Sequence, residues 1–184
     1  MKSQSRRESM AKTSKKQIEV DETKVIEQLQ KNCMENLDLF AKNCGFSRQK
    51  VWRIIKKLEG EKTIWGYTVI YDQERYNMKH FTMMIKRTTV PLQQNMIQEI
   101  LTTHLDDILP DFLIKIENIE YVHGFYDGIF TFFAPDLIVA KRFCDRFKER
   151  FYQYIASADL LEGIFFVRNQ TLQNPDIKKI VHYL

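Results

Sequence analysis

Cationic and amide side chains share one face of a helix that the sequence predicts to begin after Ser47. The opposite face is apolar, because apolar residues recur there at helical spacing, namely Val51, Ile54, Ile55 and Leu58. Guanidinium and amide groups form paired hydrogen bonds with base edges, and ammonium groups bind phosphate oxygens. This basic face therefore predicts contacts with double-stranded DNA. Its members, including the capping residue, are Ser47, Arg48, Gln49, Lys50, Trp52, Arg53, Lys56 and Lys57.

The side chains of the basic face are expected to differ in role. The three lysines are expected to bind phosphates, whereas base and backbone contacts are expected for Arg48, Gln49, Trp52 and Arg53. The alternative is a solvated helix surface, since a run of charges is usually no more than that. For Trp52, a second alternative is that the ring folds back over the first helix.

The residues before Ser47 predict a helix-turn-helix. Asn36 or Glu35 can cap a short helix whose apolar residues Leu37, Phe40 and Ala41 follow at helical spacing. Gly45 then ends this helix, because glycine adopts a positive φ at little cost. Ser47 caps the following helix. This arrangement places the second helix as the one that enters the major groove.

Flanking segments complete a winged helix-turn-helix. A first helix is predicted from its cap Asp21 to about Asn32. Residues 64–71 are rich in aromatic and β-branched side chains and predict a strand after the second helix. We place the DNA-binding domain at residues 18–72 and a polar linker at 73–80.

Charge is unevenly distributed along the 184 residues. Residues 1–66 contain 15 Lys/Arg against 9 Asp/Glu, whereas residues 67–184 contain 13 against 15. Residues 1–17 contain six basic residues and one acid, and they predict a disordered basic arm. The arm is either a solvated tail or an additional phosphate contact.

The second half predicts a ferredoxin-like domain over residues 81–174, followed by a tail at 175–184. Strands are predicted at 81–87, 114–123, 129–133 and 163–168, with helices at 91–105 and 136–154. The order strand–helix–strand–strand–helix–strand is that of the ferredoxin-like fold, so the fold class is α+β. Seven aromatic residues on these strands exceed what one covered sheet face requires, which favours a dimer that buries sheet against sheet. They are Phe81, Tyr121, Phe130, Phe132, Phe133, Phe165 and Phe166.

Gly124, Phe125, Tyr126 and Asp127 form a second candidate site, called here the effector hairpin. From the residues alone they predict a tight turn, with Gly124 at positive φ and Asp127 accepting N–H bonds of the turn.

Several ordered motifs resemble the Lrp/AsnC family of transcription regulators. They are Leu39-Phe40-Ala41-Lys42, Gly45-Phe46-Ser47, Val51, Leu58-Glu59, Ile64-Trp65-Gly66-Tyr67 and Val122-His123-Gly124-Phe125-Tyr126-Asp127. The resemblance covers about residues 18–173. It implies a sequence-specific DNA-binding regulator that forms homodimers and leaves assembly into octamers open. It also implies a small effector such as an amino acid at the effector hairpin, with Asp127 accepting an ammonium group.

Two other functions remain open at this stage. The two-domain architecture also resembles that of the sirohaem decarboxylases, enzymes in which His and Arg residues handle a tetrapyrrole. An architectural DNA-compacting protein is the other alternative, and the basic arm is compatible with it.

The remaining chemistry-bearing residues predict neither catalysis nor a metal site. Cys33, Cys44 and Cys144 have no metal-ligand spacing and read as reduced thiols. The four histidines are scattered, and no phosphate-binding glycine loop occurs. We expect no cofactor, no catalytic residues and no membrane segment, and a cytoplasmic location.

Overall fold

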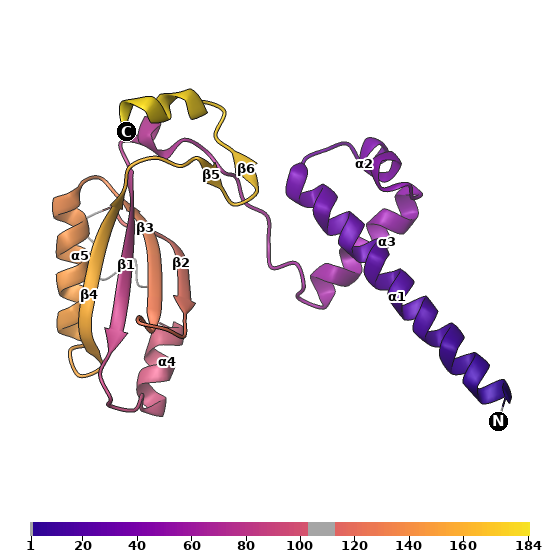
Figure 1. The fold of residues 1–184 in the computed structure, drawn as a ribbon, viewed down its shortest axis with the longest axis horizontal. Coiled ribbons are helices and arrows are strands. Elements are labelled where there is room, and N and C mark those ends of the chain that lie inside the picture. The colour runs from indigo at the N-terminus through magenta and orange to yellow at the C-terminus, as the bar shows by residue number, and fades with distance from the viewer. Residues whose placement is uncertain (1, 103–112) are drawn as a thin grey trace. The chain divides into compact units, whose positions relative to one another are not determined.

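A computed structural model of the chain describes residues 2–102 and 113–184. The chain forms two compact units (Figure 1). Unit 1 contains residues 1–70 and 168–175, and unit 2 contains residues 71–167 and 176–184. The junction at residues 70 and 71 lies beside the boundary expected after residue 72. No helix among the described residues has the length and apolar character that crossing a membrane requires.

Unit 1 is built on three helices, α1 (Lys2–Lys31), α2 (Leu37–Cys44) and α3 (Arg48–Gly60). Their apolar faces meet in one core, in which Val25 of α1, Phe40 of α2 and Val51 of α3 are almost completely buried. The predicted inner face of α3 is confirmed, since Ile54 and Leu58 are buried in the same core.

The turn signals act as the sequence predicts. The Asn36 side chain accepts a hydrogen bond from the Asp38 N–H at 2.8 Å, which caps α2. Gly45 ends α2 with φ 71°, in the left-handed region that favours glycine. Ser47 Oγ accepts a hydrogen bond from the Lys50 N–H at 3.3 Å and caps α3. These three local interactions fix where α3 begins and which face it exposes.

The expected disordered arm at residues 1–17 is instead helical, since α1 runs from Lys2. Its sequence contains no glycine or proline and many residues of high helix propensity, so no stop signal separates it from the packed part of α1. For the same reason Asp21 is not the cap of a first helix but lies within α1.

The expected strand at residues 64–71 is absent from the structure. A strand needs a hydrogen-bonded neighbour, and none pairs with this segment among the described residues. The Ile64 N–H donates to the Leu58 carbonyl, which closes the end of α3, and the following side chains are exposed. Trp65, for example, is 96% exposed. The single chain therefore carries a helix-turn-helix whose wing strand is not formed.

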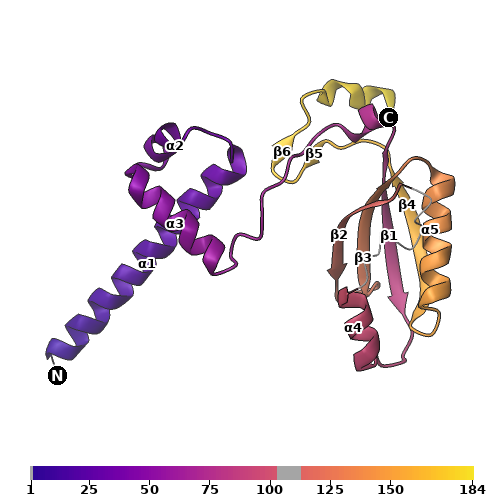
Figure 2. The same ribbon diagram turned by 180° about the vertical axis from the view of Figure 1, so that it is seen from behind.

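Unit 2 contains an antiparallel sheet and two longer helices in the predicted ferredoxin-like order. The elements are β1 (Lys79–Arg87), α4 (Gln94–Thr102), β2 (Lys115–Tyr121), β3 (Gly128–Ala134), α5 (Leu137–Arg150) and β4 (Ile155–Gly163). The spatial order β2-β3-β1-β4 places the first and third strands in the centre. Figure 2 shows the same sheet from behind. The fold class α+β is confirmed.

The core of unit 2 lies between the sheet and α5. Phe81 and Met83 of β1 and Phe132 of β3 are fully buried against Phe143 of α5. Asp136 caps α5, because its Oδ1 accepts a 2.8 Å hydrogen bond from the Val139 N–H. Alternate residues of β1 thus face α5, and this parity continues to the end of the strand at Arg87.

Two predicted elements are shifted. The last strand is β4 at residues 155–163, not 163–168, because the chain turns after Phe151 and enters the sheet eight residues earlier than expected. The helix predicted at residues 91–105 begins at Gln94, and the predicted positions 103–105 lie outside the described residues.

The seven aromatic residues divide between the two sheet faces and the chain after β4, so a dimer that buries sheet against sheet stays a prediction. Phe81, Phe130 and Phe132 face the helices within one chain and are buried there. Phe165 and Phe166 follow β4 and lie outside the four-stranded sheet. The opposite sheet face carries the polar Thr82 and Thr131, but it also carries apolar residues, namely Met84, Ile129, Phe133 and the 49% exposed Leu161.

Short elements complete the chain. Unit 2 also contains the 3-10 helices η1 (Gln73–Tyr76), in the expected linker, and η3 (Ile177–His182), in the expected tail. Strands β5 (Arg168–Asn169) and β6 (Leu172–Gln173) form a small hairpin that groups with unit 1.

Candidate nucleic-acid interface and effector hairpin

The structure brings the N-terminal half of the basic face together on α3. Arg48, Gln49, Trp52 and Arg53 are exposed, and Trp52 is 57% exposed, so its ring does not fold into the core. With Ser47, Lys50 and Leu37 of α2, they line a shallow, open hollow. Exposed cationic and amide groups at the start of a second helix suit the DNA major groove, because the groove admits a helix and the first residues of that helix contact the base edges.

Lys50 and Lys57 of the basic face form ion pairs with α1. Lys50 Nζ lies 2.6 Å from Asp21 Oδ2, and Lys57 Nζ lies 2.6 Å from Glu22 Oε1. The Lys50 ammonium also lies 3.9 Å from the centroid of the Phe46 ring. The hydrogen bond from Lys50 lowers the pKa of Asp21, and the hydrogen bond to Glu22 raises the pKa of Lys57. Both lysines thus connect α3 to α1.

The other cations of the basic face are less constrained. Lys56 Nζ lies 2.7 Å from Glu59 on the same helix, and this hydrogen bond lowers the pKa of Glu59. Arg48 is 3.7 Å from Asp38, with both side chains exposed. Within the described part of the chain, no carboxylate pairs with Arg53. Arg53 is therefore the cation of α3 that is most available to a ligand.

Asp127 anchors the effector hairpin to the end of β1. Its Oδ2 accepts a 2.8 Å hydrogen bond from the Arg87 N–H, and its own N–H donates to the Ile85 carbonyl at 2.8 Å. The expected positive φ at Gly124 is wrong: of the glycines described, Gly45 alone has one. The turn is held by bonds to β1 and does not need a left-handed glycine.

The other side chains of the effector hairpin are exposed or paired. Phe125 is 72% exposed, and Lys86 Nζ lies 4.0 Å from the centroid of its ring. Tyr126 donates a 3.1 Å hydrogen bond to Asp159 Oδ2, which raises the pKa of the Tyr126 hydroxyl. The hairpin therefore offers a cation, an aromatic ring and a carboxylate at one end of the sheet.

The histidines and cysteines do not gather into a reactive site. His80 Nε2 lies 3.5 Å from Glu117 Oε2, and its ring packs between Phe133 and Phe166. His123 and His182 are exposed, and His104 lies outside the described residues. Across residues 2–102 and 113–184, no three potential ligands are placed to hold a metal ion.

Sequence reasoning missed three residues, Asp21, Glu22 and Arg87. The sequence predicts a helix cap at Asp21, and no motif distinguishes Glu22 from the other acids of the chain. Arg87 carried a signal, because it continues the alternating core-facing series Phe81, Met83 and Ile85 with a charge.

Comparison with known proteins identifies the fold. No protein-family model and no curated protein sequence matches the chain. Solved structures do match. An AsnC family transcriptional regulator from Agrobacterium tumefaciens has 18% identity and a TM-score of 0.62, covering 85% of this chain and 96% of its own. B. subtilis LrpC has 14% identity and a TM-score of 0.60, with 82% and 96% coverage.

A transcriptional regulator from Neisseria meningitidis, solved as a complex with L-Met, gives a similar result. It has 13% identity and a TM-score of 0.61, covering 89% of this chain and 97% of that chain. These matches extend over both units. The chain therefore has the fold of the Lrp/AsnC regulators, as the sequence motifs imply.

Proposed function

We propose that this protein is a sequence-specific DNA-binding transcription regulator of the Lrp/AsnC type and not an enzyme. The observation that carries the proposal is the exposed basic face at the N-terminal half of α3, which is capped by Ser47 and open to solvent. Gln49 and Arg53 present groups suited to base edges, and Arg48 and Lys56 present cations suited to phosphates. Such a regulator acts where the DNA lies, in the cytoplasm.

The protein acts as a homodimer in this proposal, with assembly into octamers open. Support comes from residues 64–71, which have a strand-like composition but pair with no strand among the residues that the structure describes. Trp65 and Val69 are 96% and 78% exposed, a large apolar exposure for a single chain. A second copy of the segment supplies the missing hydrogen bonds and covers these side chains. Sedimentation of a monomer at micromolar concentration would contradict this.

A small effector, such as an amino acid, acts at the effector hairpin in the same proposal. Lys86, the exposed Phe125 ring and Asp127 provide groups for a carboxylate, an apolar side chain and an ammonium. The N. meningitidis regulator that shares this fold binds L-Met. A series of amino acids tested by thermal shift should contain at least one that raises the unfolding temperature, and this gain should be lost in Phe125→Ala.

Selection of bound genomic DNA fragments by the purified chain at physiological salt tests the main proposal. Enrichment of a short two-fold-symmetric motif is expected, because paired recognition helices read related half-sites. Uniform recovery of fragments would indicate an architectural protein instead. Failure to bind any fragment, together with absorbance of a bound tetrapyrrole, would favour the enzyme alternative.

A further inference from the structure

Arg87 occupies a core-facing position of β1 and is only partly satisfied there. Its Nε is buried and has no hydrogen-bond partner within the described structure. One terminal nitrogen donates to the Val90 carbonyl at 3.3 Å, and the backbone N–H donates to Asp127. A buried donor without an acceptor is costly, and it marks a place where a missing acceptor would be stabilising.

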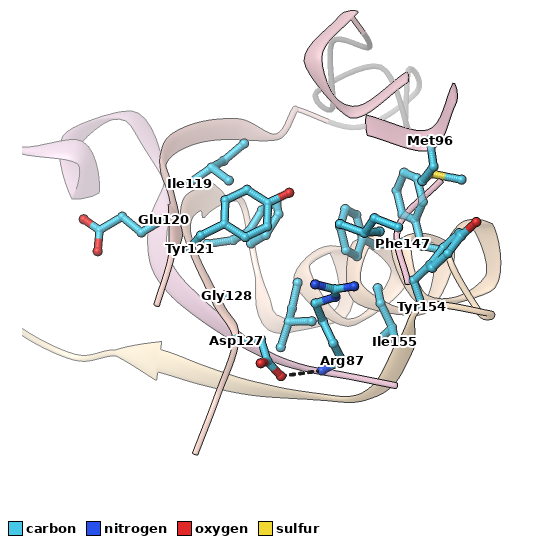
Figure 3. A pocket seen from close by; sticks show the side chains of 14 residues that line it. Arg87, Met96, Ile119, Glu120, Tyr121, Asp127, Gly128, Phe147, Tyr154 and Ile155 are labelled. Carbon is cyan, nitrogen blue, oxygen red and sulfur yellow. Dashed lines mark hydrogen bonds between the residues drawn. The ribbon is translucent and has the colours of Figure 1, made fainter. Parts of the chain in front are cut away.

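The Arg87 guanidinium points into a cavity of unit 2 (Figure 3). The cavity has a volume of about 70 Å³, several times the roughly 10–15 Å³ that one water molecule needs. Its walls are formed by residues of β1, β2, β3, α4 and α5 and by the chain around β4, and the surface that they turn to the cavity is almost entirely apolar. Phe147, Phe151 and Tyr154 are among the buried residues of the wall.

The acids that line the cavity do not neutralise the guanidinium. Asp127 binds the Arg87 backbone, and Figure 3 shows the Glu120 side chain directed away from the guanidinium. Among the described residues, no carboxylate lies within ion-pairing distance of the Arg87 side chain. One cation is thus held in an apolar cavity with no acidic partner for its side chain in the part of the chain that the structure describes.

We propose that this cavity binds a short monocarboxylate with a branched or aromatic apolar body. The ligand's carboxylate accepts hydrogen bonds from Arg87, including the one offered by Nε, and its hydrocarbon part lies against the aromatic wall. A charge-assisted pair inside a cavity is favourable because little water competes for it. The site lies within one chain, and it shares Asp127 with the effector hairpin, because the Asp127 carboxylate accepts a hydrogen bond from the Arg87 N–H.

The ligand lacks an α-ammonium group. Among the described residues that line the cavity, Asp127 accepts from the Arg87 N–H and Glu120 is directed away from the guanidinium, so an ammonium beside the carboxylate would lose water without gaining a free acid as partner. Leucine and isocaproate differ by this group alone, and they provide a matched pair of probes.

Calorimetric titration of the full chain with isocaproate and phenylacetate tests the proposal. Both acids should bind. Isocaproamide should bind at least about tenfold more weakly, because it loses a charged hydrogen bond to Arg87. Leucine should bind more weakly by a similar factor, because its ammonium group is left unpaired. Arg87→Gln should weaken acid binding by a similar factor and make the acid and the amide nearly equal. Ile155→Phe places a larger side chain in the cavity and should abolish binding of both isocaproate and phenylacetate.

Lys79→Gln is the matched control, because it removes the same charge from the other end of β1, where Lys79 pairs with Glu162. It should bind the acids like the parent. The proposal is overturned if neither acid binds at millimolar concentration, if the amide or leucine binds as well as the acid, or if Lys79→Gln loses as much as Arg87→Gln. Near-UV circular dichroism of each variant establishes that loss of binding is not loss of the fold.

Discussion

Lys50 Nζ on α3 lies 2.6 Å from the Asp21 carboxylate on α1, and the Asp21 side chain is largely shielded from solvent. The next acid of α1, Glu22, makes the equivalent contact with Lys57, seven residues further along α3. Two ion pairs thus hold α3 against α1 at two points. Lysines that by type alone suit phosphate contacts therefore set the orientation of α3, and the exposed residues between them remain available to DNA.

Charge reversal tests the Asp21–Lys50 pair. Asp21→Lys and Lys50→Asp should each lower the unfolding temperature of unit 1, because each leaves like charges facing one another. The double exchange should recover most of the loss. Tryptophan fluorescence reports this transition, since Trp52 and Trp65 both belong to unit 1. If the double exchange lowers the unfolding temperature by the sum of the two single decreases, the Asp21–Lys50 pair does not hold the helices together.

The same pair predicts a pH dependence. Lys50 lowers the pKa of Asp21 below its ordinary value in the folded chain. The unfolded carboxyl then binds protons at a higher pH than the folded one, so the stabilisation is present above the unfolded pKa. It is lost as the pH falls through the lower, folded pKa. Thermal unfolding of unit 1 between pH 6 and pH 3 should show a smaller acid-induced loss of stability in Asp21→Asn than in the parent.

Substitutions of Arg53 and Lys56 on α3 should change the affinity for DNA in different ways. Arg53→Ala should cost about 1–3 kcal/mol on the selected motif and much less on unrelated DNA, because it removes a base contact. Lys56→Ala should weaken all sequences alike and reduce the slope of log affinity against log salt by about one. Fluorescence anisotropy at several salt concentrations measures both effects. Parent-like binding by both variants would mean that α3 is not the recognition helix.

The sequence predicts unit 1 well where local signals decide the structure. Asn36, Gly45 and Ser47 fix the ends of α2 and α3 through contacts within a few residues, and these signals can be read without the fold. The strand at 64–71 could not be judged in this way, because a strand exists only with a partner, and the partner depends on assembly. Similarly, the ion pairs of Asp21 and Glu22 join residues about thirty positions apart, so no spacing rule identifies them.

In unit 2, the pattern of alternating residues predicts β1 and β3 but not β4. The helix and turn before β4 have no proline or glycine to mark their end, and the more aromatic segment at 164–167 gives the stronger strand signal. The pairing with β1 determines which segment forms the last strand. Met83 of β1 is opposite Leu160, and this register places Leu160 beside the core.

The cysteines should differ sharply in reactivity. Cys33 is exposed, whereas Cys44 and Cys144 are buried. Burial raises the pKa of the Cys44 thiol, and it raises that of Cys144 to about 12. Because the thiolate is the reactive form, iodoacetamide at pH 8 should modify Cys33 first, and the other two only after unfolding. Peptide mass spectrometry identifies the sites, and rapid modification of Cys144 in the folded chain would contradict the packing of α5.

Gly163 allows the close approach of His80 to the end of β4. A Cβ built at Gly163 would lie 2.8 Å from His80 Nδ1 and 3.4 Å from the His80 carbonyl oxygen. Gly163→Ala therefore has to displace the imidazole from its place beside Phe133 and Glu117, which links β1 to β2. We expect a destabilisation of about 1–3 kcal/mol, the usual cost of overpacking.

Gly124→Ala is the matched control for this substitution. Its added Cβ meets no atom within 4 Å, and its φ is not positive, so unfolding in urea should give a free energy close to that of the parent. Gly163→Ala combined with His80→Ala should recover much of the lost stability relative to His80→Ala alone, because the clash is then absent. If the alanine at 163 is as costly without the imidazole as with it, the backbone of β4, not His80, excludes the side chain.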